Sequence, residues 1–254
     1  MAALAIWLQA GIWGLVAGSA LVIGAAIGYF TRIPHRIVAS VMAFGSGVMI
    51  SALSFDLVEE AYKRGGFVAA ALGFFFGALL FTAANWYVSR RGAAARKSSG
   101  NEQPSEGEEH GSGMAIALGA LIDGIPEAIV IGVSMIASKT VSMVAVIAIF
   151  LSNIPEGLSS AAGMKKAGRS TLYVFGVWGT IAVVNGVAAA AGNLVFIGFS
   201  AQVIAATMAL AAGAILAMLI DTMIPEAFEV AQEYAGMIAV VGFLAAFYLS
   251  KISG

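Results

Sequence analysis

The sequence contains no cysteine, and histidine occurs only at His35 and His110 among its 254 residues. Without cysteine, a disulfide framework, a thiolate metal site and thiol redox chemistry are excluded. No glycine-rich phosphate-binding loop of the Walker type is present, so nothing indicates work driven by ATP. Charged residues make up only 11% of the chain and its net charge is −1, which gives no reason to expect a nucleic acid partner.

What the chain does contain is apolar. Hydrophobic residues account for 60% of it and its mean hydropathy is +0.94, more than a water-soluble domain can hide from solvent. We therefore expect an all-α integral membrane protein whose main partner is the lipid bilayer. A crossing needs about 20 apolar residues, and charge clusters and turn residues divide the chain into eight candidates. These eight expected transmembrane helices span residues 5–30, 36–58, 66–89, 114–137, 140–164, 170–192, 200–226 and 234–252.

One segment looks soluble, residues 90–113, which is basic at its start, acidic later and rich in serine and glycine. Its composition predicts a disordered cytoplasmic loop. It separates three helices in residues 1–89 from a central pair in 114–164 and three more in 165–254. With the N-terminus outside, the inside loops hold nine lysines and arginines and the outside loops four. The positive-inside rule thus predicts a cell membrane protein with both termini extracytoplasmic.

The tripeptide Ile-Pro-Glu occurs three times, ending at Glu127, Glu156 and Glu226, and uses three of the five prolines. Each copy lies in an apolar run long enough to cross a bilayer, where a carboxylate is costly and marks a functional site. Proline cannot donate to the carbonyl four residues earlier, so the helix kinks and that carbonyl oxygen is released. A freed carbonyl beside an acid is a candidate cation ligand.

Residues three or four apart share one face of a helix. Asp123 therefore lies on the face of Glu127, and Ser152 and Asn153 lie on the face of Glu156. Opposed across the bundle, these faces predict an oxygen cage for a divalent metal ion, which would be the transported substrate, with no prosthetic group. The polar residues predicted to line a pathway to this site are Asp56, Glu60, Asn185, Asp221 and Glu226.

Two parts of the chain also resemble each other. Met42, Gly47, Leu53 and Glu60 recur at one fixed offset as Met208, Gly213, Leu219 and Glu226. Because five helices separate the two copies, they would cross the membrane in opposite senses, as in the inverted repeats of secondary transporters. The expected arrangement is 3+2+3, with the two central helices carrying the first two Ile-Pro-Glu motifs.

This pattern resembles the ZIP (Zrt/Irt-like) family of divalent-metal transporters. The likeness covers nearly the whole chain and is carried by the polar-x-x-Pro-Glu motifs at residues 123–127 and 152–156. It implies a 3+2+3 inverted repeat, frequent homodimers and a metal site between the fourth and fifth helices. Asp123 and Gly124 stand where the family has histidine and asparagine, and Ser152 and Asn153 replace ligands of its second motif. An all-oxygen site shifts preference from zinc toward manganese, ferrous iron or magnesium.

The expected function is secondary transport of zinc, manganese or iron toward the cytoplasm, which is not an enzymatic activity. One alternative is a proton-linked carrier of another solute, in which the same acids only relay protons. Another is an intramembrane hydrolase using an acid pair such as Asp123 and Asp221. A third is a family member that senses or scaffolds without transporting.

Overall fold

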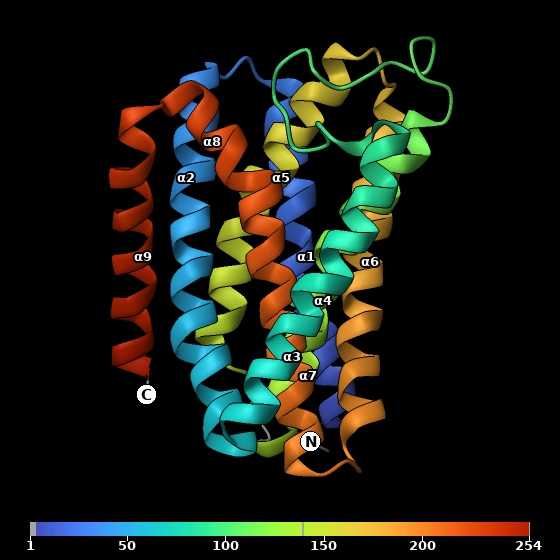
Figure 1. Cartoon of the computed structure of the whole chain (residues 1–254). Coiled ribbons are helices and arrows are strands. Elements are labelled where there is room, and N and C mark those ends of the chain that lie inside the picture. Colours follow the sequence, from blue (N-terminus) through green and yellow to red (C-terminus); the bar gives the residue numbers. More distant parts are fainter. Residues whose placement is uncertain (1–3, 139, 254) are drawn as a thin grey trace.

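The computed structural model describes residues 4–138 and 140–253, and throughout these ranges the secondary structure is helical, with no strand. Figure 1 shows the long helices standing side by side in one bundle. Their bounds are α1 (Ile6–Phe30), α2 (His35–Ala52), α3 (Glu59–Val88), α4 (Ser112–Ser138), α5 (Met143–Lys166), α6 (Thr171–Phe196), α7 (Ala201–Met218), α8 (Ile224–Ala231) and α9 (Glu233–Ser253). Three π-helical segments adjoin them, η1 (Leu53–Val58), η2 (Ser89–Ala93) and η3 (Leu219–Met223).

Several helix boundaries follow from the local sequence. Helices α5, α6 and α7 each begin after a serine, Ser142, Ser170 and Ser200, whose side chain accepts a hydrogen bond from the backbone N–H three residues later. Such N-caps satisfy donors that the first helical turn leaves free. Gly168, with φ of +77°, forms the turn between α5 and α6, a conformation that glycine adopts without strain.

Within the described residues, seven helices are long and apolar enough to cross a membrane. The pattern is that of an integral membrane protein. This number is one lower than the eight predicted ranges because α2, η1, α3 and η2 form one helical run, His35–Ala93. Gly66 interrupts that run with φ of +74° and ψ of 176°. The chain reverses there, so that α2 descends and α3 returns beside the bundle (Figure 1).

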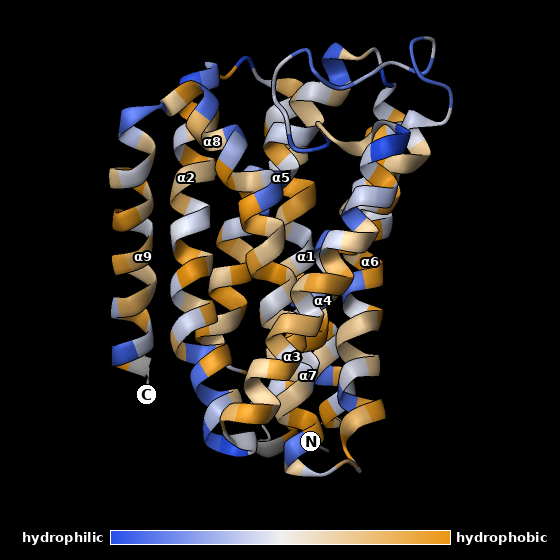
Figure 2. Ribbon diagram, viewed as in Figure 1, coloured by the Kyte–Doolittle hydropathy of each residue, from blue (hydrophilic) through white to orange (hydrophobic). Residues whose placement is uncertain are grey.

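The outside of the bundle is apolar. Phe67, Phe75 and Leu172 are among the large side chains that expose more than half of their surface. Hydrophobic residues cover the helices along their length, whereas hydrophilic ones gather at the ends and in the long loop (Figure 2). A surface of this kind is covered by lipid rather than by water.

Close helix contacts recur at equivalent places. A Cβ atom on Gly47 of α2 would lie 1.8 Å from the carbonyl oxygen of Ala239 in α9, and one on Gly213 of α7 would lie 1.9 Å from that of Phe74 in α3. These two glycines are 166 positions apart, as are the first residues of η1 and η3. Backbones approach this closely only where no side chain intervenes.

The two ends of the bundle differ. Helix α1 begins and α9 ends at the same end, and the segment between η2 and α4 lies at the other (Figure 1). That segment differs from the disordered loop predicted for residues 90–113, because part of it enters the bundle and buries Ala93 and Arg96 to Ser99. Two of the charges in this range, those of Arg96 and Lys97, pair with acids on α4 and α5 instead of facing solvent. Lys139, counted among the outside charges, lies outside the described residues.

Candidate functional site

Arg96 and Asp123 form the centre of a buried ion network. The guanidinium donates from Nε to Oδ2 and from Nη2 to Oδ1 of Asp123, both at 2.8 Å. The side chains retain only 2% and 1% of their exposure. Two parallel bonds between a guanidinium and a carboxylate fix orientation as well as charge. The first Ile-Pro-Glu helix is therefore held to the segment that follows η2.

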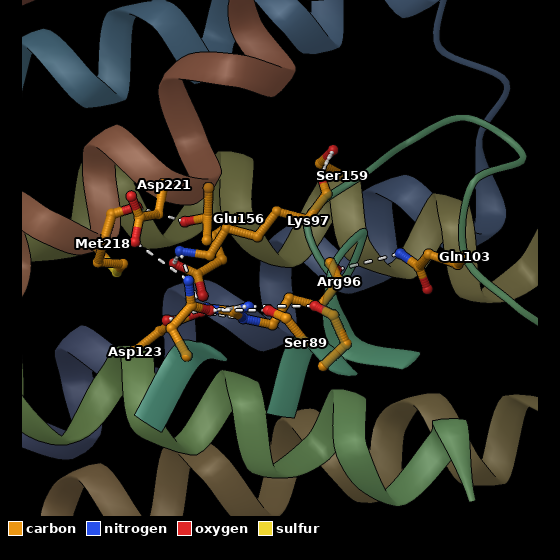
Figure 3. Close-up of polar contacts among 12 residues, drawn as sticks. Ser89, Arg96, Lys97, Gln103, Asp123, Glu156, Ser159, Met218 and Asp221 are labelled. Atoms are coloured by element: carbon orange, nitrogen blue, oxygen red, sulfur yellow. Dashed lines mark hydrogen bonds and ion pairs between the residues drawn. The ribbon is translucent and has the colours of Figure 1, made fainter. Parts of the chain in front are cut away.

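Lys97 connects the two motif helices. Its Nζ lies 3.4 Å from Oδ2 of Asp123 on α4 and 3.0 Å from Oε2 of Glu156 on α5, and the side chain is 3% exposed. Figure 3 shows Lys97 and Arg96 reaching between Asp123, Glu156 and Asp221. One ammonium thus bridges carboxylates on the two helices that carry these motifs, with Pro126 inside α4 and Pro155 inside α5.

Glu127 is the third acid of this group. It lies one turn after Asp123 on α4, is 2% exposed, and interacts electrostatically with Glu156, Lys97 and Asp123. Within residues 4–138 and 140–253, neither of its carboxylate oxygens has a hydrogen-bond partner. A buried ionised carboxylate without a partner is strongly disfavoured. Glu127 is therefore the acid of this group that no described cationic side chain contacts directly.

The other predicted ligands of the cage form hydrogen bonds to backbone carbonyls. Ser152 Oγ donates to the carbonyl of Ile149 at 3.0 Å, and Asn153 Nδ2 donates to the carbonyl of Ala17 on α1 at 3.0 Å. Both side chains are 1% exposed. Over the described part of the chain, no three histidine or carboxylate side chains are arranged to hold one metal ion. The two cationic side chains stand between the acids instead.

Glu226, the acid of the third Ile-Pro-Glu motif, also contacts the segment that carries Arg96 and Lys97. Its Oε1 accepts from the backbone N–H of Ser99 at 2.8 Å, from Ser99 Oγ at 2.9 Å and from Ser159 Oγ at 3.3 Å. Ser159 Oγ also donates to the carbonyl of Lys97. Pro225 stands near the start of α8, directly after η3, within the continuous helical run Ala201–Ala231. This acid therefore anchors the segment that carries Arg96 and Lys97.

Asp221 lies at the edge of the network and is exposed. It accepts from Asn85 Nδ2 at 3.3 Å, and Asn85 Oδ1 in turn accepts from Arg96 Nη1 at 2.8 Å. Asp221 and Asp123 thus contact different groups. Asn185 of α6 is 3% exposed, and its Oδ1 would lie 2.8 Å from a Cβ atom at Gly124. This amide fills the space beside Gly124, the residue that follows Asp123 in the chain.

The remaining predicted pathway residues lie elsewhere. Asp56 in η1 accepts from Ser250 Oγ at 3.0 Å, and Glu60 pairs with Arg64 one turn later. Both acids line a cavity of about 230 Å³ that also touches Val133 of α4. This cavity is separate from the ion network.

Four residues of the network are not predicted from the sequence, namely Asn85, Arg96, Lys97 and Gln103. The Nε2 of Gln103 donates to the carbonyls of Arg96, Ser98 and Ser160, which holds the buried segment in shape. A run of Arg-Lys followed by serines is typical of a solvated loop, so composition pointed away from the core. The one signal in the sequence is an imbalance of charge in the predicted core, because three buried acids require compensating positive charge.

Comparison with known proteins adds no identification, because no protein-family model and no curated protein matches the chain.

Proposed function

We propose that this protein is a secondary carrier of divalent cations, similar in kind to the ZIP transporters, with its substrate site at Asp123, Glu127 and Glu156. The observation that carries the proposal is the placement of these three carboxylates. They are buried on two helices that each contain a proline, and their compensating charges come from a segment outside the long helices. Acids kept inside a membrane protein mark ion pathways, and a non-helical segment can be displaced from them.

Charge balance describes how such a carrier would work. With Arg96 and Lys97 seated, two of the three acids are paired and Glu127 remains for a proton. The two side chains together carry the charge of one divalent cation. Exchanging them for the ion therefore leaves the buried charge unchanged, which avoids the large cost of an uncompensated charge in a low-dielectric interior. We regard the seated segment as the cation-free, closed state.

The backbone arrangement supports eight membrane crossings. The run His35–Ala93 reverses at Gly66, and the chain enters α1 and leaves α9 at one end of the bundle, which requires an even number of crossings. The equivalent positions of Gly47 and Gly213, and of η1 and η3, support the 3+2+3 inverted repeat. We place both termini outside the cell membrane, with the segment that bears Arg96 in the cytoplasm, and regard a homodimer as the assembly to test.

The cavity lined by Asp56 and Glu60 is our candidate for the outer entrance. It lies against α4 at Val133 and against α5 at Ala145. Val133 is six residues beyond Glu127, so about 9 Å of helix separates the entrance from the site. On the opposite side, Glu226 and Asp221 flank the seated segment. Transport toward the cytoplasm would thus need release of Ser99 from Glu226.

The donor set indicates which ions to test. Carboxylates, an amide and backbone carbonyls are hard oxygen donors, and the site has neither imidazole nor thiolate. Such ligands suit Mn²⁺, Fe²⁺ and Mg²⁺, while Zn²⁺ also binds carboxylates.

The direct test is uptake into proteoliposomes, together with calorimetric titration of the purified protein in two buffers of different ionisation enthalpy. Saturable binding of Mn²⁺ or Fe²⁺ with proton release is expected, and it should disappear in Glu127→Gln/Glu156→Gln. The matched control is Glu229→Gln/Glu233→Gln, which removes two acids outside the ion network. Arg96→Gln/Lys97→Gln should bind the ion more tightly than the unaltered protein. Equal binding in all three variants would refute the site.

A proton-linked carrier of another solute is the second candidate. Glu127 without a hydrogen-bond partner, and an ammonium shared between Asp123 and Glu156, are features of proton relays. This candidate predicts that no divalent cation binds, whereas a pH gradient drives a flux that depends on Glu127. The same proteoliposomes distinguish the two by following internal pH with no metal present.

A further inference from the structure

A second polar cavity lies at the end of the bundle where the buried segment enters. Its volume is about 420 Å³, and it is formed by the end of α1, the start of α2, the end of α5 and Ser99. The titratable residues that line it are all basic, namely Arg32, His35, Lys165 and Lys166. A cavity lined by four bases and no acid concentrates positive potential.

The basic side chains that line this cavity form no ion pairs with carboxylates in the part of the chain that the structure describes. In the described ranges, no carboxylate oxygen lies within 4.0 Å of the charged nitrogens of Arg32, Lys165 or Lys166. Lys165 Nζ donates to the carbonyl of Tyr29 at 2.5 Å, and Lys166 Nζ lies 2.6 Å from His35 Nε2. Lys165 and Lys166 are thus positioned without a direct carboxylate partner, although Glu102 interacts with Lys166 from a greater distance.

The start of α2 adds neutral donors to the same wall. This helix begins at His35 after Pro34, has no side-chain cap, and carries no acid in its first turn. The N–H groups of Ile37 and Val38 both bond the carbonyl of Pro34, which leaves those of the first two residues outside the helical ladder. Free N–H groups and the helix dipole favour an anion at this position.

Apolar residues line the same cavity. They include Gly28, Ile33, Val38 and Leu158, and Phe30 and Ile37 nearby in the chain expose more than half of their surface. A basic pocket between helices at the end of the apolar zone, bounded by hydrophobic residues, matches the chemistry of a phosphate group that is attached to, or lies beside, hydrocarbon.

We propose that this cavity binds a phosphate-bearing anion, either the headgroup of an acidic phospholipid or free phosphate, and that the bound anion holds the buried segment in place. The connection runs through Ser99, whose Oγ lies 3.4 Å from His35 Nδ1 and donates to Glu226. Ser99 is two residues from Lys97, so the wall of this cavity belongs to the segment that neutralises Asp123 and Glu156. The binding site stands on its own lining residues and does not depend on the transported substrate.

The experiment uses the full chain in two arms. In detergent, inorganic phosphate is titrated while thermal unfolding is followed. In nanodiscs, phosphatidylcholine alone is compared with phosphatidylcholine mixed with phosphatidylglycerol. Hydrogen exchange of residues 96–99 is measured in both arms. A ligand should raise the unfolding temperature and slow this exchange. An effect of phosphate in detergent identifies a free anion as sufficient, and an effect confined to phosphatidylglycerol identifies the lipid.

Lys165→Gln/Lys166→Gln should weaken the apparent affinity by about tenfold or more, since charge-assisted hydrogen bonds are lost. The matched control is Arg90→Gln/Arg91→Gln. It removes two adjacent cations that lie over Trp86 and Tyr87 and do not line the cavity. Equal loss in both variants would overturn the proposal by showing a general charge effect. No response of the unaltered protein to either ligand would overturn it as well.

Discussion

Breaking the Arg96–Asp123 pair tests the buried network most directly. Both side chains are almost fully buried and joined by two bonds of 2.8 Å. In Asp123→Asn the guanidinium loses its main partner, and in Arg96→Gln the carboxylate retains only Lys97 at 3.4 Å. Removal of one partner of a buried pair costs about 3–5 kcal/mol, because an uncompensated charge stays behind. Each single variant should therefore be strongly destabilised.

The double variant Arg96→Gln/Asp123→Asn should recover much of this loss. It removes one positive and one negative charge together, and the Lys97–Glu156 contact at 3.0 Å remains. For chains of this length, about 1 kcal/mol corresponds to roughly 2–4 °C in unfolding temperature. The single variants should thus unfold about 6–20 °C lower than the unaltered protein, and the double variant should lie above both.

Thermal unfolding in detergent, followed by tryptophan fluorescence, measures these differences. The matched control is Lys63→Gln/Glu59→Gln, a pair whose side chains are 61% and 42% exposed, with each single variant alongside. Exposed pairs contribute little, so the control should shift slightly. Additive losses for Arg96→Gln and Asp123→Asn would refute the reasoning, since coupling between contacting charges is what the geometry requires.

Three further predictions follow from other parts of the chain. Gly47→Ala places a methyl group 1.8 Å from a backbone oxygen of α9 and should destabilise the fold by about 1–3 kcal/mol. The control Gly176→Ala, with no atom within 4 Å of the new Cβ, should leave the unfolding temperature unchanged. A lowered unfolding temperature in both variants would contradict this prediction. The hydrogen bond from Arg169 lowers the pKa of Glu106 to about 2, with help from the N–H groups of Gly111 and Gly113. Its contribution is present above pH 4.5 and lost as the pH falls toward 2, so limited proteolysis of the segment should rise over that interval in the unaltered protein. In Glu106→Gln that pH dependence should weaken, and in Glu109→Gln it should persist. Gln103→Leu leaves three carbonyls without their donor and should speed hydrogen exchange of residues 96–99 about tenfold; unchanged exchange would argue against an anchoring role.

The sequence was informative where a local pattern determines structure. The helical class and the approximate ranges followed from long apolar runs, and burial of Asp123, Glu127 and Glu156 followed from their place within those runs. The predicted ranges 36–58 and 66–89 leave a break before residue 66, and the backbone reverses at Gly66. Serine caps and prolines act within one or two turns, so their effects can be anticipated.

The partners of the acids could not be derived in this way. Arg96 is 27 residues from Asp123, and Ser99 is 127 residues from Glu226. No periodicity connects positions so distant, and composition assigns an Arg-Lys pair to solvent. The burial of that pair depends on which helices assemble around it, a property of tertiary packing rather than of the local chain.

The covalent attachment of Arg96 and Lys97 has a consequence for any ion that reaches the acids. The segment that carries them is fixed at one end to η2 and at the other to α4, so its two charges remain beside the site after they detach. Short flexible tethers give effective concentrations in the millimolar range. A free cation would compete against that constant local concentration. The length of the segment, and not only the strength of the carboxylate ligands, would then set the concentration at which the ion occupies the site.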